Sequence, residues 1–152
     1  MERSLLIIKP DGVARGLIGK ILTRFEEKGF YIIASKMTMA TSEILDQHYA
    51  DLVNKIYYPN IVSSMTLGPI FVFVLEGPTG SVEYIRKMVG ETYPMDADVG
   101  TIRGDYCITV GRNVCHASDS IVTAKNEIAL WFNPEEILKD CDRPNHNLLY
   151  RD

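Results

Sequence analysis

The chain has 152 residues, of which 46% are hydrophobic and 24% charged, with a formal net charge of −4 at pH 7. This composition excludes a disordered chain and fits one globular domain, and the acidic balance makes nucleic acid unlikely as the main partner. The first apolar run, Leu5 to Ile8, is too short for a signal peptide or a membrane span. The three cysteines match no metal or disulfide spacing, so we expect free thiols, a cytoplasmic location and no membrane partner.

In chain order, hydrophobic patterning predicts strands over residues 4–9, 30–39, 69–75 and 106–110. Helical spacing of apolar residues predicts helices over 17–25, 44–52, 82–89 and 121–131. Gly29 reads as a helix end and Pro134 as the start of a short closing helix. This order predicts an α+β fold, the ferredoxin-like βαββαβ sandwich with an antiparallel four-stranded sheet, although alternation alone also fits a doubly wound sheet.

The stretch from residue 91 to 105 has little periodicity and contains Pro94, Gly100 and Gly104. A long loop without regular structure is uncommon in a compact domain and is often functional. We therefore expect it to contribute to a site.

His116 has the most informative surroundings of the three histidines. It follows the predicted strand 106–110 and precedes Ser118 and Asp119, two residue types that favour helix N-caps. Such a position suits a group that carries phosphate, and a neutral imidazole is a nucleophile. A lone histidine near a helix start is nevertheless more often a cap or a surface residue.

Phosphoryl transfer needs positive charge held in place, which Lys9, Arg103 and Arg112 could supply. Each of these side chains taken alone also fits a solvated surface position. The chain has no Gly-x-x-x-x-Gly-Lys-Ser/Thr segment, so a P-loop is not indicated.

Residues 113–120, Asn-Val-Cys-His-Ala-Ser-Asp-Ser, resemble the Asn-x-x-His-Gly/Ala-Ser-Asp signature of nucleoside diphosphate kinases. Segments 8–13, 24–30, 100–106 and 130–136 resemble the family's other blocks in the family's order. The likeness covers roughly residues 3–138, so it implies one domain over 1–152 with a C-terminal tail from about 139. It also implies the ferredoxin-like fold with extra helices and a long loop.

The resemblance implies that His116 takes the γ-phosphoryl group of a nucleoside triphosphate and passes it to a nucleoside diphosphate, with broad tolerance of base and sugar. Glu127 would hold the imidazole through the ring nitrogen that does not attack, and Lys9 and Tyr49 would complete the catalytic group. The implied nucleotide-binding residues are Lys9, Lys55, Tyr57, Arg86, Thr92, Arg103, Val110 and Asn113.

In this assignment Tyr57 and Val110 sandwich the base, which allows any base because all have a π-face. The cofactor would be Mg²⁺, carried by the substrate phosphates, with Asp119 as a candidate contact through water. Lys55 stands where the family has an arginine, and so keeps the charge without the bidentate fork. Tyr57 stands in place of a phenylalanine.

The resemblance further implies self-association, most often as a homohexamer. Tyr93 and Val99 depart from the family pattern in the long loop used at subunit contacts. Two other classes compete: a nucleotide-binding module without turnover, and a nucleic-acid-binding protein, which the acidic charge disfavours. We expect His48 to be a packed or capping histidine and Cys115 a small buried neighbour of His116.

Overall fold

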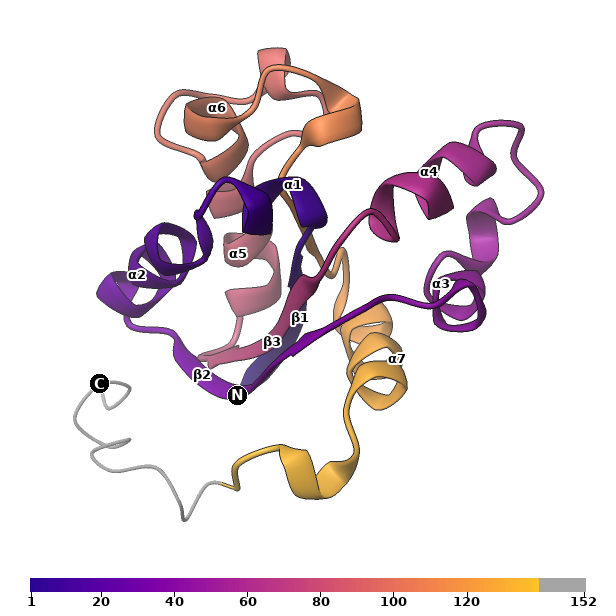
Figure 1. The fold of residues 1–152 in the computed structure, drawn as a ribbon. Coiled ribbons are helices and arrows are strands. Elements are labelled where there is room, and N and C mark those ends of the chain that lie inside the picture. Colours follow the sequence, from indigo (N-terminus) through magenta and orange to yellow (C-terminus); the bar gives the residue numbers. More distant parts are fainter. Residues whose placement is uncertain (140–152) are drawn as a thin grey trace.

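The computed structural model describes residues 1–139, and a four-stranded sheet forms its centre (Figure 1). The strands are β1 (Glu2–Ile8), β2 (Tyr31–Thr38), β3 (Ile70–Gly77) and β4 (Cys115–Ala117). Their order is β2-β3-β1-β4, and every neighbouring pair is antiparallel. Helix α2 (Ile18–Lys28) links β1 to β2, and α5 (Ser81–Val89) lies between β3 and β4. The ferredoxin-like prediction is therefore confirmed, and a doubly wound parallel sheet is excluded.

The sheet is buried on both faces, which explains the continuous apolar run of β1. Leu6 and Ile8 pack into a core with α2 and α5. Leu5 and Ile7 pack into a second core with α3 (Ser42–His48) and α7 (Ile121–Trp131), which lie on the other side of the sheet in Figure 1. The two sets separate because successive strand residues point to opposite faces.

Two helix ends show how local chemistry sets the element boundaries. Helix α2 ends at Gly29, whose φ of 106° lies in the left-handed region that glycine adopts at little cost, as predicted. The N-cap residue of helix α5 is Gly80, which has no side chain that could cap the helix. The Glu2 carboxylate caps it instead, accepting hydrogen bonds from the N–H groups of Gly80 (2.8 Å) and Val82 (3.0 Å).

The structure corrects the predicted strand over 106–110. Tyr106 ends helix α6 (Ile102–Tyr106), and Val110 begins the 3₁₀ helix η3 (Val110–Arg112). Ile108 and Val110 are 77% and 48% exposed, so this apolar run is not a core strand. The last strand is the three-residue β4, too short for an alternation pattern to reveal.

Several further elements extend the basic fold. Helices α1 (Pro10–Ala14) and α4 (Tyr58–Met65) were not predicted. The long loop contains the 3₁₀ helix η2 (Pro94–Asp96) as well as α6, so it has regular structure of its own. Short helices η1 (Ala50–Leu52) and η4 (Pro134–Glu136) follow α3 and α7, and Pro134 begins η4 as predicted.

Within residues 1–139, no helix is long and apolar enough to cross a membrane. The tail expected from about residue 139 lies, apart from Lys139, outside the described residues.

Candidate active site

His116 lies within β4, where it pairs with Ile7 of β1. Paired residues of antiparallel strands point to the same face. Ile7 faces the core under α3 and α7, so His116 points toward these helices too. The expected position between strand 106–110 and a helix start is wrong: α7 begins at Ile121, with Ser120 as its N-cap.

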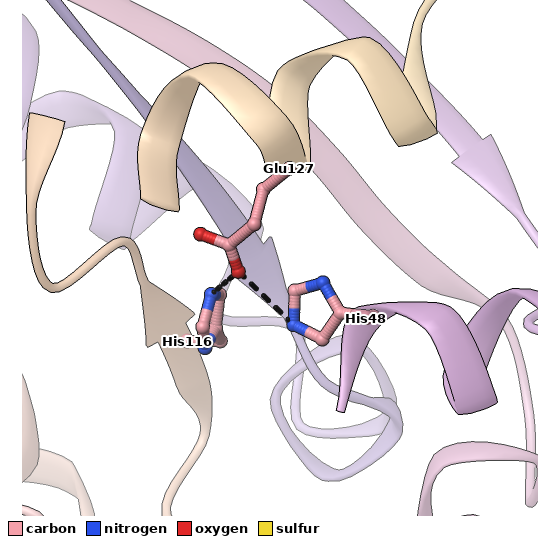
Figure 2. A group of neighbouring side chains, drawn as sticks. All are labelled: His48, His116 and Glu127. Atoms are coloured by element: carbon pink, nitrogen blue, oxygen red, sulfur yellow. Dashed lines mark hydrogen bonds and ion pairs between the residues drawn. The ribbon is translucent and has the colours of Figure 1, made fainter. Parts of the chain in front are cut away.

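Glu127 comes from the buried stripe of α7, which also contains Ala124, Ile128 and Trp131. Ile121, expected on this stripe, is 59% exposed. Figure 2 shows the Glu127 carboxylate pointing between two imidazoles. Its Oε2 lies 2.6 Å from Nε2 of His116, and the residue as a whole is only 6% exposed.

The hydrogen-bond pattern fixes the proton on His116. Burial works to raise the pKa of Glu127, but the hydrogen bond from His116 and its electrostatic interaction with the carboxylate outweigh burial, and the pKa lies below its ordinary value. An ionised carboxylate only accepts hydrogen bonds, so Nε2 of His116 must carry the hydrogen. Nδ1 then holds the ring's free lone pair, on the side away from Glu127 in Figure 2.

His48 is the second imidazole at this carboxylate, and its side chain is fully buried. Its Nε2 lies 3.3 Å from the same Oε2 of Glu127, and its ring centroid is 4.5 Å from that of His116. Its Nδ1 accepts a hydrogen bond from the indole Nε1 of Trp131 at 3.1 Å. The prediction of a packed histidine is confirmed, but its contact with Glu127 and His116 was missed.

The two imidazoles and Glu127 superficially resemble a metal site, since their ligand atoms lie within 4.8 Å of one another. The Trp131 N–H, however, occupies the Nδ1 lone pair of His48, so Nε2 carries the hydrogen and has no lone pair to offer a metal. Mg²⁺ in addition prefers oxygen ligands. The cluster is therefore not a metal site: His116 is hydrogen-bonded to Glu127, and His48 lies 3.3 Å from the same oxygen.

The segment before His116 makes a strained turn. Val114 has φ of +69°, an outlier for a β-branched residue, and the N–H of Cys115 donates to the carbonyl of Asn113 at 2.8 Å. Together these features match the strained form of the γ-turn. Asp11 holds it by accepting a hydrogen bond from the N–H of Val114 at 3.1 Å. The turn sets the direction in which β4 presents His116.

Two cations are tied to this turn. Lys9, at the end of β1, donates to the side-chain oxygen of Asn113 at 2.7 Å. Burial, and next the charge of Arg103, lower the pKa of Lys9 to about 8. Arg103 is only 3% exposed and donates to the carbonyls of Gly90 (3.0 Å) and Cys115 (2.6 Å).

A cavity of about 930 Å³ opens in front of His116. The predicted site residues that line it are Lys9, Tyr49, Tyr57, Arg86, Thr92, Arg103, Val110, Asn113 and His116. Glu127 stands behind His116, whereas Lys55 and Asp119 are exposed and are not among the lining residues.

The cavity has a positive lining in an acidic chain, because the cations Lys9, Arg86, Arg103 and Arg112 outnumber its one carboxylate, Asp11. Further lining residues were not predicted: Asn60, Ser64, Leu67 and Tyr93. Asn60 and Ser64 lie on α4, whose Pro59 near the N-terminus was a usable signal for the missed helix.

Comparison with known proteins agrees with this geometry. The family model described as nucleoside diphosphate kinase matches residues 2–137. The bovine nucleoside diphosphate kinase B is 51% identical over 138 residues, which cover 91% of this chain and 90% of the relative. A nucleoside diphosphate kinase family protein from Babesia bovis has a TM-score of 0.92 at 40% identity, covering 99% of this chain and 100% of that one. The enzyme from Halobacterium salinarum, solved in complex with CDP, has a TM-score of 0.92 at 38% identity and covers 98% of both chains.

Proposed function

Because the chain belongs to the nucleoside diphosphate kinase family, and is thus a phosphotransferase acting on nucleotides, we propose that His116 is the residue that carries the phosphoryl group. The observation that carries this proposal is the 2.6 Å contact between Nε2 of His116 and Glu127. It leaves a lone pair on Nδ1, in a ring that lines the cationic cavity. A nucleophile oriented by a second group is the usual arrangement in covalent catalysis.

In the first half-reaction, the Nδ1 lone pair of His116 forms a bond to the γ-phosphorus. The bond from that phosphorus to the bridging oxygen breaks, and the electron pair leaves with the nucleoside diphosphate. In the second half-reaction, a terminal oxygen of another diphosphate attacks the phosphohistidine, and the N–P electrons return to Nδ1. Throughout, the hydrogen stays on Nε2 and Nε2–H stays hydrogen-bonded to the Glu127 carboxylate. This hydrogen bond stabilises the positive charge that develops on the ring when Nδ1 is phosphorylated.

The cavity suits a nucleotide whose γ-phosphate faces Nδ1 of His116. Arg86, Arg103 and Thr92 would hold the phosphates, while Lys9 and Asn113 would reach the ribose and phosphate oxygens. Tyr57 and Val110, 47% and 48% exposed at the cavity, would take the base between them. Lys55 would approach the phosphates only from outside the lining, as a flexible point charge.

We expect Mg²⁺ to enter with the substrate phosphates. The cavity lining offers one carboxylate, Asp11, and the N–H of Val114 already occupies an oxygen of it, so the chain fits an ion held mainly by phosphate. Bound Mg²⁺ would neutralise phosphate charge. Asp119, exposed just before α7, would contact it through water. Omitting Mg²⁺ should abolish turnover, and Asp119→Asn should raise the Mg²⁺ concentration required.

The direct test is transfer of phosphoryl from ATP to GDP by the purified chain. Initial velocities at several fixed GDP concentrations should give parallel double-reciprocal lines, because one pocket serves both half-reactions. His116→Ala should be inactive, with its melting temperature preserved. Intersecting lines would indicate direct transfer between two bound nucleotides, and no turnover in the wild type would leave only the binding-module alternative.

We also propose a cytoplasmic homohexamer. Large apolar side chains of the long loop are strongly exposed on the single chain, with Met95 at 80% and Val99 at 92%, as expected of a surface that meets another subunit. Cys107 and Cys115 are free and buried, which suits a reducing compartment. Light scattering on the purified protein measures the assembly size, and a monomer would contradict the proposal.

A further inference from the structure

The buried imidazole of His48 has defined polar contacts but no role in the transfer reaction described above. It lies beside the Glu127 carboxylate, between Trp131 of α7 and His116 of β4. His48 does not line the nucleotide cavity. Any influence on the reaction must therefore pass through its neighbours Glu127, His116 or Tyr49.

The tautomer of His48 follows from its neighbours. The indole N–H of Trp131 can only donate, so Nδ1 of His48 must be the acceptor. A neutral imidazole carries its one hydrogen on the other nitrogen, Nε2. This nitrogen lies 3.3 Å from Oε2 of Glu127, the same oxygen that bonds His116.

The surroundings keep this ring neutral. Burial, and next the electrostatic influence of His116, lower the pKa of His48 to about 3. The other groups that act on it are Glu127 of α7, which raises the pKa, and Lys9 at the end of β1, which lowers it. Tyr49, the next residue in the chain, packs edge-on against the ring at 4.6 Å between centroids.

We propose that His48 is a positioning residue for phosphoryl transfer: fixed by Trp131, it keeps a polar Nε2–H 3.3 Å from Oε2 of Glu127, and this electrostatic contact helps to hold His116 with Nδ1 toward the nucleotide. This inference rests on the proposed role of His116. A polar N–H held beside one oxygen of a carboxylate favours one orientation of that group. The chain of contacts runs Trp131, His48, Glu127 and His116.

Two substitutions separate the donor from the acceptor of His48. In His48→Gln the amide nitrogen can occupy the place of Nε2 and donate to Glu127. In His48→Asn the shorter amide reaches only the place of Nδ1, where its oxygen can accept from Trp131. Both are uncharged amides, so Asn serves as the matched control for Gln.

Single-turnover phosphorylation by γ-labelled ATP without acceptor measures the effect. We expect His48→Asn, which loses the polar contact with Glu127, to slow labelling about tenfold, and His48→Gln to stay within about threefold of the wild type. The dissociation constant for ATP should change less than about twofold, because His48 is not among the residues that line the cavity. Equal slowing of both variants, or none in either, would overturn the inference.

Imidazole nitrogen spectra of the wild-type protein test the same claim without any substitution. We expect His48 to show hydrogen on Nε2 and not to titrate between about pH 5 and pH 8. Hydrogen on Nδ1, or titration in that range, would overturn the inference. A wild-type chain that takes no label would instead refute the role of His116, so the two failures are distinguishable.

Discussion

Glu127→Gln is the substitution that best isolates what the buried carboxylate contributes. The amide keeps nearly the same shape and can still accept from Nε2 of His116, but it has no charge. A hydrogen bond to a charged group contributes about 1.5–3 kcal/mol, and one between neutral groups about 0.5–1.5 kcal/mol. The difference is about 1–1.5 kcal/mol, so phosphorylation of His116 should slow about tenfold.

Folding should change little in the same variant. Glu127 is only 6% exposed, and replacing a buried charge by a neutral group of equal size also removes its desolvation cost. Rapid-quench labelling with γ-labelled ATP measures the rate, and thermal unfolding measures stability. Glu43→Gln, at an exposed position of α3, is the matched control and should label like the wild type. Wild-type labelling in Glu127→Gln, with the fold intact, would refute the reasoning.

Four further predictions concern pH and packing. The KM for ATP should rise above about pH 8, where Lys9 loses its charge. This rise should be absent in Lys9→Gln. An identical dependence of KM on pH in both proteins would contradict the prediction. The lowered pKa of Lys9 should also make the free energy of unfolding increase between pH 8 and the ordinary pKa of lysine. In this range Lys9 is protonated in the unfolded chain but not in the folded protein, so a rise in pH favours folding. Glu2→Gln should cost about 1 kcal/mol, the usual worth of an N-terminal helix cap, when measured by urea unfolding at neutral pH. The hydrogen bonds from the two backbone N–H groups lower the pKa of Glu2 in the folded protein. The stability that Glu2 adds is therefore fully present above its unfolded-state pKa and is lost as pH falls through its folded-state pKa. A stability difference between wild type and Glu2→Gln that stays constant down to strongly acidic pH would argue against this. Gly104→Ala should lower stability by about 2 kcal/mol, because a Cβ there would lie 2.0 Å from the carbonyl oxygen of Asp98; an unchanged melting temperature would count against this.

The sheet and its main helices could be predicted because their signals are local. The apolar run of β1, the helical spacing before Gly29 and the stripe of α5 each occur within one window of sequence. The strand β4 could not be found in this way. Its three residues are held in place by pairing with β1, more than a hundred positions away, and this long-range pairing leaves no periodic trace.

The site shows the same division. A sequence motif predicted that His116 belongs to the site, and the family resemblance predicted the same for Glu127. Periodicity alone would have put Glu127 on a solvated face of its helix. The strain at Val114 and its support by Asp11 depend on backbone angles, which composition does not reveal. The partners of His48 come from α7, far along the chain, so only the fold could show that a packed histidine reaches the carboxylate.

The central claim is that Glu127 holds Nε2 of His116 and leaves Nδ1 to attack phosphorus. The most direct measurement is the position of the phosphoryl group on the ring, read from phosphorus–nitrogen couplings in nitrogen-labelled protein after reaction with ATP. The account predicts an acid-labile phosphohistidine substituted at Nδ1 of His116. A phosphoryl group at Nε2, or one that persists in His116→Ala, would contradict it.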